Sequence, residues 1–414
     1  MKTSPRPPFP LRGLAFTGLC VLLFLAAAAC KLSGSGGSSK EQETVLQFLS
    51  YIPNYPENRA WASYGDAAAW YASWNVPRVY NMDDVNDLDD TSRAYWMRMM
   101  QTQTYPPDCL DPNYIVSYSL RDEFGFDLFD MSRFISAGNA PKVISVLEFD
   151  GNRQVIADAL SSKGYAEQEL ATGWVLYSLN EDYQLNMRAE MHAEQMGNLN
   201  RIILSDHYLI VGKATEVVEA ALDAHDKHTP SLAEDKAYIA SVQALYDSSL
   251  KDTGELVGVI WVDRGEFNAL PPIFEKATEE QAQQMMEEYG LNTDLPFTLA
   301  AFATRHSQEK GATYLILALV FPKGTDAEDA AQVLEERLEK ADSLRIRGPF
   351  LEAMGAEDVN THAVQAGGLP VTLTVFRLDD PKPEAISEGG QPMARVRAWL
   401  DFVLSRDLMF LYAP

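Results

Sequence analysis

Few side chains in this chain of 414 residues have the types and spacing that chemistry requires. His225 and His228 lie three residues apart in AHDKH. Two histidines at that spacing share one face of a helix and could bind Zn²⁺ or Cu²⁺. No third ligand can be identified from the spacing, so we expect a polar helix end at this position and predict no metal site.

Catalytic motifs are nearly absent. Residues 248–251 read SSLK and match the serine-nucleophile motif S-x-x-K, but the K-T-G that accompanies it elsewhere is missing. We find no G-x-S-x-G, H-E-x-x-H, Walker A or G-x-G-x-x-G. The sequence therefore predicts neither a cofactor nor a catalytic residue and favours a binding protein. A hydrolase whose site is assembled from distant Asp, Glu and His remains the alternative.

One segment is unusually rich in aromatic residues. Residues 57–74, ENRAWASYGDAAAWYASW, predict a helix that Pro77 ends. We expect this helix to pack between two layers of the fold. The alternative is that Trp61, Trp70 and Trp74 form a surface on which a ligand stacks, or a contact with other envelope proteins.

The N-terminus has the order of an export signal. Residues 1–13 are short, basic and proline-rich, and residues 14–29 are apolar, uncharged and end in alanines. This apolar run is somewhat shorter than the roughly 20 residues that span a bilayer as a helix. We therefore predict that residues 1–29 are a signal peptide and not an anchor helix.

The residues around Cys30 indicate how the mature protein begins. Ala27-Ala28-Ala29-Cys30 resembles the bacterial lipobox, and the resemblance implies cleavage before Cys30 and attachment of acyl chains to its thiol. Ala27 stands where Leu is usual, so cleavage after an Ala-x-Ala motif without acylation remains the alternative. Residues 30–40 end in a Gly/Ser-rich flexible coil that reaches roughly 15–20 Å, which suits a tether.

These features predict a lipoprotein, anchored in a membrane through Cys30 and facing away from the cytoplasm in a bacterial cell envelope. The net charge is −25, which excludes nucleic acid as a partner. The partner we expect instead is a protein, a cell-wall component or a solute. Removal of residues 1–29 and acylation of Cys30 would leave Cys109 as the last free thiol, so no intramolecular disulfide is expected.

The body of the chain reads as an α+β fold of two successive units. We expect an N-terminal helical segment over 41–110, a first unit over 111–250 and a second over 251–414, each a mixed or antiparallel sheet with covering helices. The predicted strands are 115–120, 142–149, 173–179, 201–206, 207–212, 255–263, 297–305, 312–321, 371–378 and 407–413. The predicted helices beyond residue 110 are 152–164, 214–225, 325–341 and 395–405.

The order of strands and helices suggests an internal duplication of 110–250 and 251–414, because strand pairs followed by a helix recur in both. Residues 124–165 and 207–225 also resemble segments of uncharacterised bacterial exported proteins and lipoproteins built from repeated α+β units. That resemblance implies a fold of this kind and assigns no catalytic or binding residue.

Overall fold

The chain divides into two units, residues 1–43 and 44–414, and the second contains the whole sheet and all its covering helices except the first four residues of the helix Lys40–Ser50. The computed structural model describes residues 40–99, 110, 120–170, 173–189, 192–267, 278–288, 295–343, 347–356, 358–380, 394–405 and 407–412. The predicted signal peptide, Cys30 and Cys109 lie outside these described residues.

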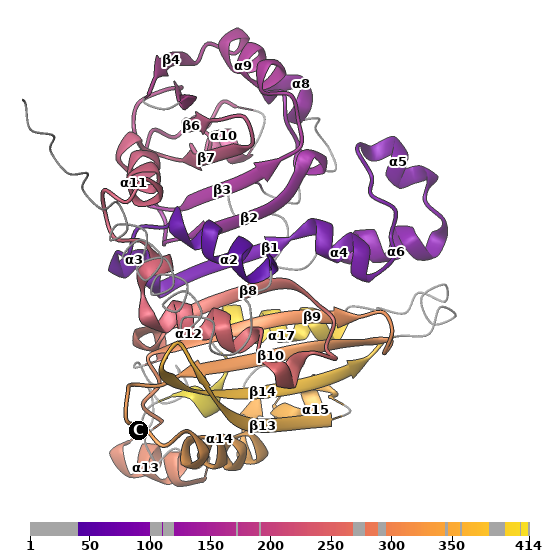
Figure 1. The fold of residues 1–414 in the computed structure, drawn as a ribbon, viewed down its shortest axis with the longest axis vertical. Coiled ribbons are helices and arrows are strands. Elements are labelled where there is room, and N and C mark those ends of the chain that lie inside the picture. The colour runs from indigo at the N-terminus through magenta and orange to yellow at the C-terminus, as the bar shows by residue number, and fades with distance from the viewer. Residues whose placement is uncertain are drawn as a thin grey trace, which may run out of the picture. The chain divides into compact units, whose positions relative to one another are not determined.

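A twelve-stranded sheet, antiparallel at every pairing, runs through the described part of residues 44–414 (Figure 1). Its strands lie side by side in the order β13-β14-β10-β9-β8-β1-β2-β3-β7-β6-β5-β4. Their bounds are β1 Trp61–Asp66, β2 Met131–Ala137, β3 Ile144–Phe149, β4 Ala166–Glu169, β5 Val175–Ser178, β6 Arg201–Leu204, β7 Tyr208–Gly212, β8 Glu255–Asp263, β9 Leu299–Ser307, β10 Ala312–Val320, β13 Asp358–Ala366 and β14 Leu369–Asp379. A separate short pair joins β11 (Asp342–Ser343) to β12 (Gly348–Pro349).

Helices cover one face of the sheet, which faces the viewer in Figure 1. They are α2 (Lys40–Ser50), α11 (Thr215–His225) and α12 (Lys236–Leu245). Phe48 on α2, Val218 on α11 and Tyr238 on α12 are buried in the core between these helices and the strands. Successive residues of a strand point to opposite faces, so alternate strand residues such as Tyr64 and Trp261 complete this core.

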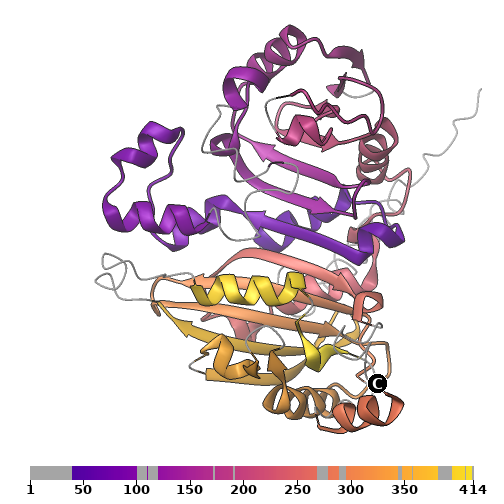
Figure 2. The same ribbon diagram turned by 180° about the vertical axis from the view of Figure 1, so that it is seen from behind.

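The other face is seen in Figure 2 and carries a larger set of helices. Those whose side chains enter its core are α4 (Ala67–Ser73), α5 (Met82–Asp87), α6 (Asp90–Met99), α8 (Leu120–Phe124), α9 (Arg153–Ser162), α14 (Ala327–Lys340), α15 (Phe350–Met354) and α17 (Ala394–Ser405). The remaining helices are α3 (Pro56–Ala60), α10 (His192–Gln195) and α13 (Glu279–Glu288). Both faces of the central strands are thus apolar, which explains their nearly continuous hydrophobic sequences.

The two halves of the sheet follow one path. In the first half β1, β2 and β3 pair in sequence, α9 crosses one face, and the hairpin β6–β7 returns so that β7 pairs with β3. In the second half β8, β9 and β10 pair in sequence, α14 crosses the same face, and the hairpin β13–β14 returns so that β14 pairs with β10. The halves meet where β1 pairs with β8. This is the arrangement that duplication of one unit would produce, and the first of the two similar halves of the sheet includes β1.

The predicted α+β class, with antiparallel strands and covering helices, is confirmed. The strand predicted at 255–263 coincides with β8 (Glu255–Asp263), and the strands predicted at 142–149, 312–321 and 371–378 overlap β3, β10 and β14. The helices predicted at 152–164 and 325–341 overlap α9 and α14.

The predicted helix over 57–74 is wrong in its centre. Residues Trp61–Asp66 form β1, a central strand paired with β2 on one side and β8 on the other. The helix α4 begins only at Ala67, where the Asp66 carboxylate accepts a hydrogen bond from the Ala69 N–H at 2.8 Å and caps it. Residues 61–66, WASYGD, contain one alanine and have no strong helix propensity, so pairing with strands distant in sequence decides their structure.

Two further strand predictions need correction. The closing strand predicted at 407–413 is instead a short 3-10 helix, Met409–Leu411. The buried Arg337 side chain holds it by donating hydrogen bonds to the carbonyls of Phe410 and Tyr412 at 3.0 and 3.1 Å, so those carbonyls do not need a neighbouring strand. Of the strand predicted at 115–120, Leu120 begins α8 and the rest lies outside the described residues.

Candidate binding pocket

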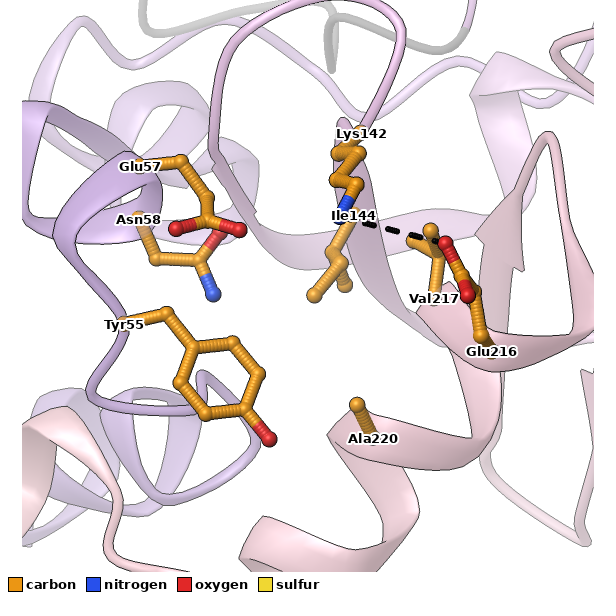
Figure 3. Close-up of a pocket in the computed structure, with 8 residues that line it drawn as sticks. All are labelled: Tyr55, Glu57, Asn58, Lys142, Ile144, Glu216, Val217 and Ala220. Atoms are coloured by element: carbon orange, nitrogen blue, oxygen red, sulfur yellow. Dashed lines mark ion pairs between the residues drawn. The ribbon is translucent and has the colours of Figure 1, made fainter.

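A cavity of about 230 Å³ opens between α3, the start of β3 and the start of α11 (Figure 3). Tyr55, Glu57 and Asn58 line it from the beginning of α3. Figure 3 shows the Tyr55 ring and the Glu57 carboxylate on the same side of the cavity. Tyr55 is 39% exposed, more than any other described Phe, Tyr or Trp except Tyr80, and this exposure gives a ligand access to its ring.

The opposite wall comes from two other elements. Ile144, the first residue of β3, and Val217 and Ala220 on α11 provide an apolar surface. Lys142 and Glu216 lie at the rim, with Lys142 Nζ 3.9 Å from Glu216 Oε1. The cavity thus combines one aromatic ring, an apolar floor and three charged groups, two of them carboxylates.

The backbone that presents Tyr55 and Glu57 is tied to a segment more than 170 residues away. Pro53 and Ser231 form an isolated antiparallel bridge, and the Asn54 N–H donates to the carbonyl of Pro230 at 2.9 Å. Pro56 occupies the first turn of α3, where its missing N–H leaves no backbone hydrogen bond unmade. The wall of the pocket that carries Glu57 is therefore held by the tertiary fold as well as by its own short helix.

A glycine in the turn between β2 and β3 allows this turn to approach α3 closely. Gly138 has φ +95°, and a Cβ atom there would lie 2.4 Å from the Lys142 carbonyl oxygen and 2.9 Å from Asn58 Oδ1. Only glycine fits this conformation and this space. Asn58 is buried, and its Nδ2 donates to the Pro53 carbonyl at 3.0 Å. The turn between β2 and β3 can thus pack directly on α3 and bring Lys142 and Ile144 to the cavity.

The two carboxylates of the pocket differ in their protein partners. Glu216 accepts a hydrogen bond from the Tyr183 hydroxyl at 2.7 Å and faces Lys142. Burial and this hydrogen bond raise the pKa of Tyr183 to about 12. Glu57 is half-buried, and no described residue gives it a hydrogen bond or an ion pair. A partly desolvated carboxylate without a protein partner is the feature of this cavity that points to a ligand.

The tryptophans proposed as stacking residues lie elsewhere. Trp70 and Trp74 are 3% and 8% exposed and pack on each other with ring centroids 5.9 Å apart. Trp74 also stacks on His306 at 3.8 Å, so its rings contact protein and not solvent. Trp61 is half-buried in β1 and packs against the same core. The structure brings the rings of Trp70 and Trp74 into contact, and Trp61 packs against the same core from β1.

A second cluster of polar groups surrounds that histidine. His306 is 2% exposed, and its Nε2–H donates to Asp380 Oδ2 at 2.9 Å. The Trp74 ring covers one face of the imidazole, with an angle of 17° between the planes. His306 Nδ1 has no hydrogen-bond partner among the described residues. This cluster is filled by its own side chains and takes no part in the cavity beside α3.

The other sequence candidates lie on the surface. His225 contacts Asp226 at 3.0 Å and stacks on Tyr51, while His228 contacts Asp223 at 3.4 Å. Within the described residues no three His, Cys, Asp or Glu side chains are arranged to hold a metal ion. Ser249 Oγ, part of the SSLK motif, lies 2.9 Å from His362 Nε2, and His362 Nδ1 lies 3.1 Å from Asn360 Oδ1.

Sequence reasoning missed every residue of the pocket. Its lining residues come from three segments, near residues 55–58, 142–144 and 216–220, and nothing in any one segment indicates the other two. The one local signal was Tyr-Pro-Glu at 55–57, because proline followed by an acidic residue is typical of the first turn of a helix. That signal predicts α3 and gives no reason to expect a cavity beside it.

Comparison with known proteins adds little. No family model matches the chain, and no curated protein matches its sequence. A solved structure of TP0453, in its crystal form IV, is similar over 84% of this chain and 99% of its own, with a TM-score of 0.32 and 8% identity. No helix in the described parts of the chain has the length and apolar character needed to cross a membrane.

Proposed function

We propose that this protein is a lipoprotein of a bacterial cell envelope, anchored through Cys30, which works outside the cytoplasm as a binding protein. The residues that support the anchor are the alanines before Cys30 and the Gly/Ser-rich tether behind it. Two or more acyl chains on one cysteine, at about 0.8 kcal/mol per buried CH₂, would hold the protein stably on a membrane. The tether would keep the folded body clear of the lipid surface.

The observation that supports binding is the half-buried Glu57 carboxylate, which faces a preformed cavity and has no partner among the described residues. A cavity that combines an apolar floor with a few placed polar groups is typical of small ligand sites. The binding partner would be a solute, a cell-wall component or an exposed group of another protein that enters this cavity.

The anchor is tested by acyl labelling. Cells that express the full chain would be fed a labelled fatty acid, and Cys30→Ala would be compared with Cys109→Ala as the matched control. We expect label in the original protein and in Cys109→Ala, and none in Cys30→Ala, which should leave the membrane fraction. Equal labelling of Cys30→Ala would rule out this site of attachment.

Binding is tested by recovery of the protein from detergent-solubilised membranes, followed by native mass spectrometry. We expect a bound solute or partner with the original protein and its loss from Glu57→Gln. Glu219→Gln, an exposed position on α11 outside the pocket, is the control and should retain it. Recovery of nothing from any of the three, together with hydrolase activity on a panel of esters, would overturn the proposal.

A second candidate, hydrolysis, is favoured by the contact between Ser249 and His362. Ser249 Oγ would attack an ester carbonyl while His362 Nε2 takes its proton and returns it to the leaving alcohol, and water would then release the acid. This candidate ranks second for two reasons. Ser249 and Asn360 are exposed, so the site does not exclude water. The Ser249 N–H already donates to Asp247 Oδ1 and is therefore not free to stabilise the oxygen of the attacked carbonyl. A fluorophosphonate probe should label the original protein and not Ser249→Ala, and equal labelling of both would exclude this site.

A further inference from the structure

We propose that the pocket binds an alkylguanidinium or alkylammonium group, such as the side chain of an arginine or lysine. This inference rests on the proposed binding function and names the chemical class of the ligand. It is supported by the charges at the pocket, by the position of the aromatic ring, by the shape of the cavity and by the charge of the whole chain.

The charges favour a cation. Glu57 and Glu216 bring two carboxylates to the cavity against one ammonium, that of Lys142. Lys142 is exposed, and its 3.9 Å contact with Glu216 is too long for a strong ion pair. An anionic ligand would face both carboxylates, whereas a cation would give Glu57 the partner that the described residues do not supply.

The aromatic ring favours the same class. Tyr55 and Glu57 lie on the same side of the cavity in Figure 3, and a cation above a tyrosine ring is attracted by the negative face of the ring. The planar guanidinium can also form two parallel hydrogen bonds with a carboxylate while it stacks on a ring. An ammonium group would use the same two residues with one fewer hydrogen bond.

The apolar floor and the volume suit an alkyl stem. Ile144, Val217 and Ala220 would contact three or four methylene groups while the charged end reaches Glu57. A cavity of about 230 Å³ is smaller than the roughly 300 Å³ at which drug-sized ligand sites begin. It therefore suits a single side chain or a small amine.

The charge of the chain acts over a longer range. A net charge of −25 raises the local concentration of cations and repels anions before any contact is made. The attraction would be screened at distances beyond about 8 Å at physiological salt, so it would assist encounter while Glu57 and Tyr55 provide selectivity.

The experiment uses the full chain in detergent micelles, with ¹³C-labelled isoleucine methyl groups so that Ile144 reports occupancy of the pocket. The probes are n-butylguanidinium, its uncharged isostere n-butylurea, and the tripeptides Gly-Arg-Gly and Gly-citrulline-Gly. We expect the Ile144 methyl signal to shift with the cationic probes, and the two neutral probes to bind at least about tenfold more weakly. Binding of n-butylguanidinium alone would identify a free small cation as the source of the group, and binding of Gly-Arg-Gly would identify a protein side chain.

Variants separate the two proposals. Glu57→Gln should weaken the cationic probes by about tenfold and leave the neutral ones unchanged, while Glu219→Gln should change neither. Neutral probes that shift Ile144 as strongly as the cations, or an unchanged affinity in Glu57→Gln, would overturn the cation class and leave the pocket as a binding site. If no probe shifts Ile144, and native mass spectrometry also recovers no ligand, the binding function itself fails.

Discussion

The Tyr55–Glu57 pocket and the Trp74–His306 cluster combine the same chemical groups with opposite outcomes. Each joins an aromatic ring to a carboxylate near the end of a hairpin, the first beside β2–β3 and the second beside β9–β10. They lie on opposite faces of the sheet. In the cluster, the protein supplies the group that sits between ring and carboxylate, the His306 imidazole. In the pocket, no described residue forms a hydrogen bond or an ion pair with the Glu57 carboxylate.

The two regions differ in how far neighbouring helices cover the end of the hairpin. The β9–β10 end is closed because Trp74, just after α4, stacks on His306, and the tilted ring of Tyr95 on α6 packs on Trp74. At the β2–β3 end, the described residues that line the cavity come from the five-residue α3 with Tyr55 before it, from the start of β3 and from the first turns of α11. We infer that the first arrangement stabilises the fold and that the second leaves a site for a ligand.

The largest expected effect is the loss of His306. His306→Ala removes a buried ring stacked on Trp74 and leaves the Asp380 carboxylate without its 2.9 Å hydrogen bond. We expect a loss of about 2–4 kcal/mol in the free energy of unfolding, measured by urea denaturation. His228→Ala is the matched control, because that side chain is 70% exposed and should change stability by less than about 0.5 kcal/mol. Equal effects of the two variants would contradict the distinction.

Gly138→Ala tests how the pocket side is built. The new Cβ would meet the Lys142 carbonyl and Asn58 Oδ1, and the φ of +95° would be strained. We expect a loss of about 2–3 kcal/mol in unfolding free energy, because clash and strain act together.

Gly324→Ala separates the effect of the clash from the effect of the backbone strain. It has the same φ of +95° with no atom within 4 Å of the added Cβ, so it should show the strain alone, about 1 kcal/mol. Gly138→Ala should also weaken binding at the pocket, and Gly324→Ala should not. Equal losses of stability in Gly138→Ala and Gly324→Ala would mean that the predicted clash with Lys142 and Asn58 adds nothing to the backbone strain.

The sequence predicts the fold best where strands are buried on both faces. The nine residues of β8 and of β10 are mostly apolar and rich in β-branched and aromatic side chains, and a run of this length and composition favours a covered strand over a buried helix. The sequence predicts the structure of a segment poorly where the strands that pair with it determine that structure. WASYGD at 61–66 has small and polar residues that suit several structures, and only its neighbours β2 and β8 make it a central strand. The edge strand β13, DVNTHAVQA, is polar and half-exposed, so no apolar pattern identified it.

The pocket is harder to predict for a related reason. Glu57 is one of 59 acidic residues, and its type and sequence neighbours do not distinguish it from those that face solvent. What distinguishes it is the absence of a partner among the described residues, together with a cavity walled by β3 and α11. Both properties belong to the folded chain. The tryptophans attracted attention because of their composition, yet the fold buries Trp70 and Trp74 against each other.

The smallest change in stability is expected for a substitution that places a cation inside the pocket, so that the pocket, like the cluster around His306, is filled by the protein itself. Ala220 lies on α11 one turn after Glu216 and faces the cavity, so Ala220→Lys would place an ammonium between the two carboxylates. A lysine four residues after a glutamate stabilises a helix by about 0.2–0.5 kcal/mol, and Glu57 would gain an internal partner as His306 has in Asp380. We expect a comparable small gain in unfolding free energy, measured by urea denaturation, and loss of binding of the cationic probes.

Ala220→Met is the matched control for this conversion. It fills the cavity to a similar extent without the charge, so it should block binding but give no electrostatic gain. A gain in Ala220→Lys that disappears in 1 M salt, and is absent from Ala220→Met at every salt concentration, would show that the pocket lacks only a cation to become like the cluster around His306. Equal stability of the two variants at low salt would mean that the carboxylates of the pocket do not act on a cation placed between them.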